Sequence, residues 1–484
     1  MPIVLSGWKT RKTSIGVVVI VLLAAVTALT FGTYGFFTLP SGPSSTSASN
    51  RTGLSTVLPR TLVRYSGLSL LRTNGMQIVD QYGNIVVLRG VDLTGYEYVP
   101  PTLSVYPHHS SDYATIASWG FNVVRLPISW ENLEPRPGQY NDSYLQNLVD
   151  HDIEWAKEYG VYIVLDMHQV CWSSHFEFCN GSYSAGVPRW AVSSYPNNDA
   201  GEDAFLQDFF SGLGPNGTIP SASNPSMLTR FFAVWRHVAS RYANETAIAA
   251  YDLLNEPPST TPLSFYRNAT EAVRAIDQHH ICLWETDGPI EVPNVIYSPH
   301  YPQDSLTSYN ATSLKVGVRQ IVDFSRKWDV PVFIGEWGMQ ADSPGVVQYI
   351  QDGLSLFDSY SISSAWWDYA SGDFTMDLFY GNGSARQILV QNLVRPFISE
   401  LTSSITQTST FTLSNGSITY SQMLNSTGPS QIQVSIPTGY SIANIHTSSA
   451  FPVRSQSTPD GRTLLLTFPS AASTVTVEYT SRPS

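Results

Sequence analysis

The sequence predicts a (β/α)8 TIM barrel followed by a small C-terminal antiparallel β-sandwich. Eight short apolar segments alternate with segments of helical periodicity, and most of the apolar segments end on polar residues that can do chemistry. From about residue 401 the chain changes to alternating strands rich in Ser and Thr. At 484 residues the chain is too long for one ordinary domain, and it fits a barrel of roughly 300 residues with a smaller module.

Four regions are expected along the chain. They are a basic stub with a transmembrane anchor or signal (residues 1–39), a linker rich in Ser, Thr, Pro and Gly (40–60), the barrel (61–400) and the sandwich (401–484). The linker composition is typical of a flexible tether.

The N-terminal region predicts a membrane-crossing helix. Ile15 to Leu39 is almost wholly apolar, and Lys9, Arg11 and Lys12 precede it. Such a length can span a bilayer, so we expect an uncleaved anchor in preference to a cleaved signal peptide, which stays the alternative. Because basic flanks remain in the cytoplasm, the rest of the chain is expected outside the cell, anchored or secreted.

Sequons and cysteines agree with an external location. Three cysteines provide no disulfide scaffold, but Cys171 and Cys179 are close enough to clip one loop, while Cys282 is expected as a buried free thiol. Ten Asn-x-Ser/Thr sequons exceed what composition predicts, although accidental matches in a Ser/Thr-rich chain are the alternative. They are Asn50, Asn141, Asn180, Asn216, Asn244, Asn268, Asn310, Asn382, Asn415 and Asn425.

Eight apolar segments are expected as the parallel strands. They are Ile85–Leu93, Phe121–Ile128, Val161–His168, Ala249–Pro257, His280–Thr286, Val295–Tyr301, Pro331–Trp337 and Ser363–Tyr369. The segments between them carry apolar residues at helical spacing, clearest in 142–159, 228–242, 264–278 and 314–328. A doubly wound open sheet is the alternative, but no Gly-rich phosphate loop follows the first strand.

Polar residues gather where these strands end. Active sites of such barrels form at the carboxyl ends of the strands, so the side chains found there are expected to converge on one site. The candidates are Arg125, His168, Asn255, Glu256, His300, Glu336 and Trp367. A metal site built from the histidines and carboxylates lacks the usual ligand spacing, so we expect neither metal nor cofactor.

Two of these residues form a pair of carboxylic acids suited to one kind of reaction. Hydrolysis of a glycosidic bond needs one carboxyl group to protonate the leaving oxygen and a second to attack the anomeric carbon or activate water. Glu256 and Glu336 end the fourth and seventh predicted strands, which places them across the barrel mouth from each other.

The segments around both glutamates resemble glycoside hydrolase family 5. Tyr251 to Pro257 reads YDLLNEP and Phe333 to Gly338 reads FIGEWG. The resemblance implies that Glu256 is the acid/base, that Asn255 holds the sugar 2-hydroxyl and that Glu336 is the nucleophile of a retaining mechanism. GFNVVRL at 120–126 is similar to the arginine strand of that family.

Further segments are similar to the endoglycoceramidase branch of the family, whose barrel is also followed by a β-sandwich. These segments are LDMHQ at 165–169, WENLEP at 130–135, PRWA at 188–191 and LVRP at 393–396. The family commonly has His-x-Tyr after the sixth strand, whereas this chain has His300, Tyr301 and Pro302. Tyr301 could contact the nucleophile through a shifted backbone, or that role could be empty.

Physical reasoning assigns roles to the other candidates. Arg125 is expected to keep Glu336 ionised, and a partly apolar pocket with Glu336 nearby is expected to raise the pKa of Glu256. His168 and His300 would supply hydrogen bonds around the acid/base and the sugar. Trp367, rather than its neighbour Trp366, is expected to stack on a sugar ring, with the weaker candidates being Trp172, Trp190 and Trp337.

These observations predict an extracellular, retaining endo-β-glycosidase acting on an oligosaccharide, polysaccharide or glycolipid as a monomer. A glycolipid substrate follows the branch resemblance, and a β-glucan or mannan endoglycosidase is the first alternative. A carbohydrate-binding surface protein without turnover is the second. The net charge of −12 argues against a nucleic-acid partner, because phosphate binding needs clustered Lys and Arg.

Overall fold

The fold is taken from a computed structural model of the chain. It describes residues 67–98, 108–176, 185–303, 305–372, 375–414, 417–448, 453–468 and 473–481. The predicted anchor, the linker and Cys179 lie outside these ranges, so the anchor stays a prediction. Within these ranges, no helix has the length and apolar character needed to cross a membrane.

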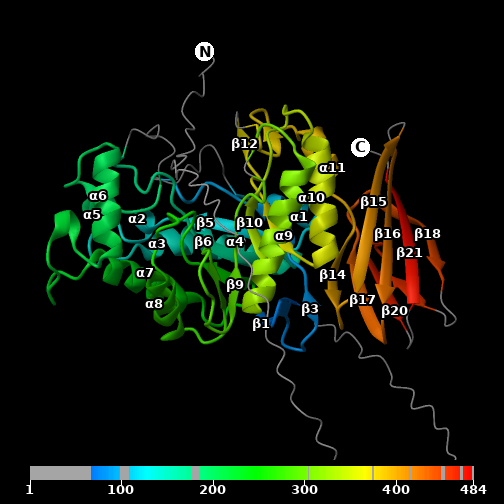
Figure 1. The fold of residues 1–484 in the computed structure, drawn as a ribbon, viewed down its shortest axis with the longest axis horizontal. Helices are drawn as coiled ribbons and strands as arrows, with labels where there is room; N and C mark the ends of the chain where they lie inside the picture. The colour runs from blue at the N-terminus through cyan, green and yellow to red at the C-terminus, as the bar shows by residue number, and fades with distance from the viewer. Residues whose placement is uncertain are drawn as a thin grey trace, which may run out of the picture. The chain divides into compact units, whose positions relative to one another are not determined.

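Eight parallel strands form the barrel, as predicted (Figure 1). An isolated parallel bridge between Tyr297 and Val332 joins β9 to the segment before β10 and completes the ring. In chain order the strands are β4 (Arg89–Asp92), β5 (Val123–Ile128), β6 (Tyr162–Met167), β7 (Ile248–Asp252), β8 (Ile281–Trp284), β9 (Val295–Tyr297), β10 (Phe333–Trp337) and β11 (Ser363–Trp366).

Helices follow most of these strands and cover the barrel (Figure 1). The helix α9 (Ala311–Trp328) illustrates how the sequence sets their limits. The Asn310 side chain accepts hydrogen bonds from the first turn, and Asp329 ends the helix in a left-handed conformation. The others are α1 (Ser110–Ser118), α2 (Trp130–Leu133), α3 (Asp142–Tyr144), a π-helical turn (Leu145–Val149), α4 (Asp150–Tyr159), α5 (Arg189–Val192), α6 (Asp199–Phe210), a 3-10 turn (Pro215–Gly217), α7 (Met227–Tyr242), α8 (Leu263–Arg274), α10 (Val346–Tyr360) and α11 (Gln387–Leu393).

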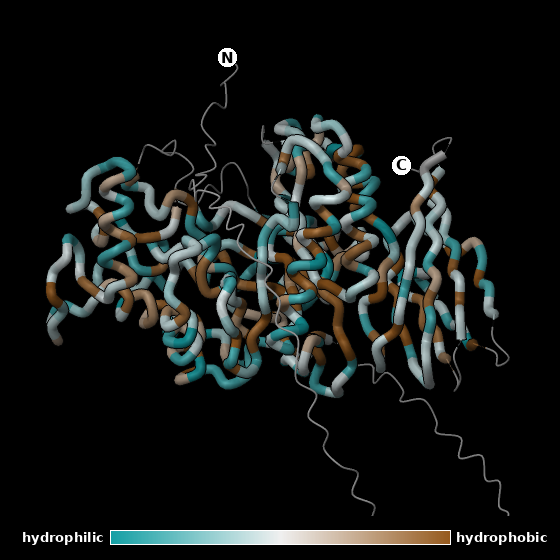
Figure 2. The backbone as a smooth tube through the Cα atoms, viewed as in Figure 1, coloured by the Kyte–Doolittle hydropathy of each residue, from teal (hydrophilic) through white to brown (hydrophobic). Residues whose placement is uncertain are grey.

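The apolar core has a layer inside the barrel and a larger layer between strands and helices. Val123, Val164 and Phe333 belong to the inner layer, while Trp235, Trp337 and other aromatic residues fill the outer one. Figure 2 shows the hydrophobic residues concentrated along the central strands. The buried strands are therefore nearly continuous apolar segments, which is why they could be predicted from the sequence.

The antiparallel region consists of two sheets, as expected for a sandwich. One sheet has the order β15 (Thr406–Ser414), β16 (Ser417–Ser426), β21 (Ser473–Ser481), β18 (Tyr440–Thr447). The other has the order β1 (Arg72–Asn74), β2 (Gln77–Val79), β3 (Ile85–Val86), β14 (Phe397–Leu401), β17 (Ser430–Ser435), β20 (Thr463–Phe468), β19 (Arg454–Ser457). A two-stranded sheet of β12 (Ser371–Gly372) and β13 (Phe379–Tyr380) follows β11.

The second sheet draws its strands from both ends of the chain. The strand expected at Ile85–Leu93 is two strands, of which β3 pairs with β14 and only β4 enters the barrel. Val79 and Ile85 accordingly belong to the sandwich core. This sheet contains strands from before and after residue 401, so strand pairing does not mark a domain boundary there. The boundary at residue 401 stays a prediction.

A buried ion cluster joins the barrel to the sandwich. Asp358 at the end of α10 accepts hydrogen bonds from Arg89 of β4 at 2.6 Å and from Arg395 at 2.7 Å. Tyr420 of β16 donates to the same carboxylate at 3.2 Å, and the Gln407 side chain donates to the Asp358 carbonyl at 2.7 Å. The two arginines outweigh the effect of burial and lower the pKa of Asp358.

Candidate active site

The strand-end residues that the sequence singled out lie together in the structure. Arg125 donates to Asn255 and Glu336, and His300 contacts Glu256 and Glu336. The amide of Asn255 lies 3.5 Å from His168, whose ring stacks on Trp367. A continuous chain of contacts therefore links all seven candidates.

Arg125 on β5 is the fully buried centre of this group. Its guanidinium contacts Glu336 at 2.9 Å, Asn255 at 2.8 Å, Asp92 at 3.0 Å, Asp252 at 3.0 Å and Asp166 at 3.1 Å. One buried cation thus faces four carboxyl groups, three of which are fully buried. Burial accordingly raises the pKa of Asp252 to about 7, although Arg125 opposes this effect, and it raises the pKa of Asp92 as well.

Glu336 is held by positive and hydrogen-bonding groups at both carboxylate oxygens. Arg125 donates to Oε1, and the Tyr301 hydroxyl donates to Oε2 at 3.1 Å. Tyr301 has a positive φ of 40°, and its backbone N–H donates to the Glu336 carbonyl at 2.8 Å. The sequence left open whether Tyr301 contacts Glu336. In the structure, the turned backbone brings the Tyr301 hydroxyl to the Glu336 carboxylate.

Glu256 has different surroundings. Its side chain is 45% exposed, compared with 5% for Glu336. Its carboxylate has one hydrogen-bond partner among the described residues, His300 Nδ1 at 3.1 Å. One carboxylate oxygen of Glu256 lies within 4.8 Å of one of Glu336, so the two acids face a common space.

Glu285, which the sequence analysis missed, holds the other side of the His300 ring. Its Oε1 lies 2.7 Å from His300 Nε2. The ring packs against Gly335, where an added Cβ would lie 2.6 Å from Nε2, so only glycine leaves space for it. Burial disfavours the imidazolium, but Glu285, Glu336 and Glu256 outweigh it and raise the pKa of His300 well above its usual range.

The protonation of Glu256 differs from the expectation. The partial burial of this side chain raises its pKa, but the hydrogen bond and positive charge of His300, with smaller contributions from His168 and Arg125, outweigh that effect and lower the pKa. An apolar pocket and a nearby Glu336 can be inferred from the sequence, but the direct contact of a cation with Glu256 cannot. The expected upward shift of the pKa is therefore wrong for the free protein.

His168 and Asn255 extend the contacts of Arg125 toward Trp367. His168 Nδ1 lies 2.7 Å from Asp166, and the carboxylates around it outweigh burial and raise its pKa to about 9. The Asn255 oxygen accepts from Arg125, which leaves its amide group directed at the Gln169 carbonyl, 3.1 Å away, and at His168.

Trp367 is the half-buried tryptophan of the Trp366–Trp367 pair, as expected. Its ring stacks on His168 with centroids 5.4 Å apart, whereas Trp366 is buried against Trp337. Two of the weaker stacking candidates are wrong, because Trp337 and Trp172 are 1% and 4% exposed and pack within the core.

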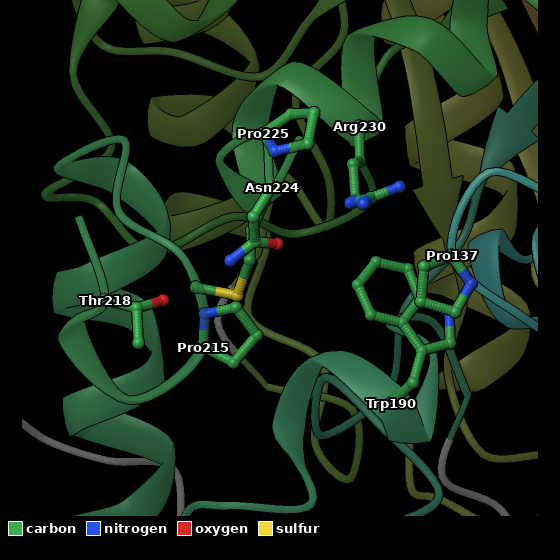
Figure 3. A pocket seen from close by; sticks show the side chains of 8 residues that line it. Pro137, Trp190, Pro215, Thr218, Asn224, Pro225 and Arg230 are labelled. Carbon is green, nitrogen blue, oxygen red and sulfur yellow. The ribbon is translucent and has the colours of Figure 1, made fainter. Parts of the chain in front are cut away.

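Trp190 lines a separate cavity of about 270 Å³ (Figure 3). Arg230 lies over its ring at 5.4 Å, and its indole N–H donates to the Glu134 carbonyl. The catalytic candidates do not line this cavity. The WENLEP and PRWA segments therefore carry a structural network here, in which Trp130 donates to the Glu134 carboxylate at 2.7 Å.

Several polar residues of the site were missed although a sequence signal existed. Asp92, Asp166, Asp252 and Glu285 all stand at or just after the carboxyl ends of barrel strands, where the rule that found the other candidates also applies. Gln169 is marked in the sequence only as the last residue of the LDMHQ segment.

Two sets of three side chains place possible metal ligands within 4.8 Å of one another. They are Asp252, Glu285, His300 and Glu256, His300, Glu336. Both sets contain His300, whose two nitrogens are already engaged by carboxylates. Their arrangement is accounted for by the ion pairs of His300 with Glu256, Glu285 and Glu336.

Known proteins resemble this chain along most of its described length. An endoglucanase C of Acetivibrio thermocellus is 22% identical over 327 residues, which cover 54% of this chain and 84% of the relative. An endoglycoceramidase I of Rhodococcus hoagii is 26% identical over 256 residues, 49% of each chain. The solved endo-glycoceramidase II from Rhodococcus sp. matches the fold with a TM-score of 0.64 at 22% identity, over 84% of this chain and 99% of its own.

The family is shown by a match that covers more than half of the chain. The cellulase family, glycosyl hydrolase family 5, matches residues 79–373, a range that contains both glutamates. The chain therefore belongs to glycosyl hydrolase family 5 and is a glycosidase related to the endoglycoceramidases and cellulases of that family.

Proposed function

We propose that this protein is a retaining endo-β-glycosidase that cleaves the glycan from a glycolipid outside the cell. The observation that carries the retaining mechanism is the pair of carboxylates with oxygens within 4.8 Å. Retaining glycosidases hold their carboxyl groups about 5 to 5.5 Å apart, whereas inverting enzymes need about 6.5 to 9.5 Å to admit a water molecule.

The surroundings of the two acids support different roles in two steps. In the first step Glu336 attacks the anomeric carbon while Glu256 gives its proton to the leaving oxygen, which forms a covalent glycosyl-enzyme. In the second step Glu256 takes a proton from water, which attacks the same carbon and releases Glu336. Arg125 and Tyr301 suit the first role because their hydrogen bonds hold both oxygens of the Glu336 carboxylate in place.

His300 and the open position of Glu256 suit the second role. A proton donor must reach a leaving group that enters from outside, and the Glu256 side chain is 45% exposed. When Glu256 gives up its proton, the adjacent imidazolium stabilises the carboxylate. Trp367 and Asn255 are the proposed sugar contacts, through ring stacking and a hydrogen bond to the 2-hydroxyl.

A glycolipid substrate is supported by the comparisons along the chain. An endoglycoceramidase is among the sequence relatives, at 26% identity over 49% of this chain, and the solved endo-glycoceramidase II shares the fold over 84% of this chain. The sequence match to endoglucanase C has a lower identity, 22%, over 54% of this chain. A β-glucan endoglycosidase is the second candidate, because this chain spans 84% of that endoglucanase.

The external location is supported by the apolar segment at residues 15–39 and by the sequons. Seven sequon asparagines fall within the described residues, and none of them is buried. They are Asn141, Asn216, Asn244, Asn268, Asn310, Asn382 and Asn425. Accessible acceptors suit N-glycosylation in a secretory pathway.

Hydrolysis of a substrate panel tests the proposal. The full-length protein, purified in detergent from a secretory host, is assayed on a glycosylceramide, a mixed β-glucan and a mannan, with Glu336→Gln as control. We expect release of an intact glycan from the glycosylceramide, loss of this activity in the variant, and a protein mass that falls on removal of N-glycans. Cleavage of polysaccharide alone would replace the glycolipid with a glucan or mannan, and inactivity on all three would favour the non-catalytic binder.

A further inference from the structure

The backbone of Glu256 has an unusual conformation for a residue with a side chain. Its φ is +40°, in the left-handed region that L-residues other than glycine rarely occupy. Such a conformation persists where the surrounding structure holds it. It also sets the direction in which the Glu256 side chain leaves the chain, so whatever holds the backbone also places the carboxyl group.

Gln169 makes the contacts that hold this backbone. Its side-chain amide donates to two successive carbonyls, that of Asn255 at 3.0 Å and that of Glu256 at 3.1 Å. Its own carbonyl accepts from the Asn255 side chain at 3.1 Å. Gln169 thus contacts the Asn255–Glu256 turn three times from the neighbouring strand end.

Gln169 is itself fixed from the opposite side. Its Oε1 accepts from the Trp172 backbone N–H at 3.0 Å, and the residue is 7% exposed. Gly186 packs directly against it with a φ of +128°, and a Cβ at that position would lie 2.7 Å from the Gln169 Cβ. The side-chain amide of Gln169 is therefore held in place by the Trp172 backbone and by packing against Gly186.

We infer that Gln169 is a positioning residue for the proposed acid/base, holding the Asn255–Glu256 turn so that the Glu256 carboxyl group reaches the leaving oxygen. Apart from His300, no described residue hydrogen-bonds the exposed Glu256 carboxylate, so its placement depends on the backbone beneath it. Proton transfer requires the carboxyl group within hydrogen-bond distance of the leaving oxygen. The inference rests on the proposed acid/base role of Glu256.

The test uses the dependence of rate on the leaving group. Aryl β-glycosides of the glycan that the substrate panel identifies are hydrolysed by the full-length protein and by Gln169→Met, which keeps the side-chain length and lacks both N–H donors. Phenol is a poor leaving group that needs a proton, whereas 2,4-dinitrophenol leaves without one. A misplaced acid/base therefore affects the two substrates differently, which a general loss of stability would not do.

We expect Gln169→Met to lower kcat/KM for the phenyl glycoside about 100-fold, the low end of what general acid catalysis contributes, and for the dinitrophenyl glycoside less than about 5-fold. Gln169→Glu, which keeps the acceptor for Trp172 and turns the donor into an acceptor, should act in the same direction. The matched control is Gln407→Met on β15, a buried glutamine that also donates to a carbonyl and lies outside the site.

The Glu256→Gln variant tests the proposed role of Glu256 separately from that of Gln169. It should show the same leaving-group dependence, and if it does not, the proposed role of Glu256 fails. If Glu256→Gln shows that dependence while both Gln169 variants lose equal activity on both substrates, or lose none, the positioning role of Gln169 is overturned and the proposed function stands.

Discussion

At the scale of single residues, the two glutamates differ in the side chains that contact them. Glu336 is buried between Arg125 and Tyr301, whereas Glu256 projects outward beside His300. Both are glutamates at strand ends in the sequence, and only the three-dimensional neighbours give them different chemistry. The motif predicted which glutamate takes which role, and the contacts supply a physical reason for that assignment.

The pH dependence of activity should follow His300. Because Glu256 must carry a proton to act as an acid, and the His300 cation lowers its pKa, activity should be lost as pH rises through a value below the usual range of glutamate. In His300→Asn the cation is removed, the pKa of Glu256 rises, and the basic limb of the kcat/KM profile should move to higher pH. Kinetics of an aryl glycoside between pH 2 and 8 measure this.

His279→Asn is the control for this experiment, since His279 is exposed in the loop before β8. The groups that face His300 are Glu256, Glu285 and Glu336, with Asp252 close by. A basic limb that stays in place or moves to lower pH in His300→Asn would show that His300 does not set the protonation of Glu256.

Among the elements, the strand ends were predictable and the pairing of the outer strands was not. Parallel strands buried on both faces read as apolar runs, and their last residues reach the site whatever the helices do. By contrast, β3 pairs with β14, more than 300 residues away in the sequence, and no local pattern specifies such a partner. For the same reason, the contact of Tyr301 with Glu336 could not be predicted from the sequence, because it depends on the turned backbone at Tyr301.

The ion cluster at the end of α10 should hold the barrel and the sandwich together. Asp358→Asn leaves Arg89 and Arg395 buried with no carboxylate between them, which typically costs about 3 kcal/mol or more. Thermal unfolding should therefore begin at a clearly lower temperature. Because the folded-state pKa of Asp358 is lowered, its contribution to stability is present above the unfolded-state pKa and is lost as pH falls through the lower folded value.

Asp150→Asn provides the control, since Asp150 pairs with Arg241 at a partly exposed position where an ion pair contributes at most about 1 kcal/mol. An Asp358→Asn protein that unfolds at the same temperature as Asp150→Asn would show that the buried cluster is not needed to join the two parts.

The whole molecule combines a barrel that was predictable in outline with a site whose electrostatics were not. Alternation of apolar and helical segments indicated the barrel, and strand-end chemistry indicated the reaction. The sign of the Glu256 pKa shift, the ion pair of Glu285 with His300 and the clamp of Gln169 on the Glu256 turn all depend on residues brought together by folding. Local sequence does not encode such contacts.

The most direct test of the central claim is to trap the covalent intermediate. The protein is incubated with a 2-deoxy-2-fluoro β-glycoside bearing a good leaving group, digested and mapped by mass spectrometry. Retention through Glu336 predicts one glycosyl adduct per chain on the peptide that contains Glu336, and no adduct in Glu336→Gln. Labelling of a different residue, or turnover of the substrate panel with no adduct at all, would contradict the account.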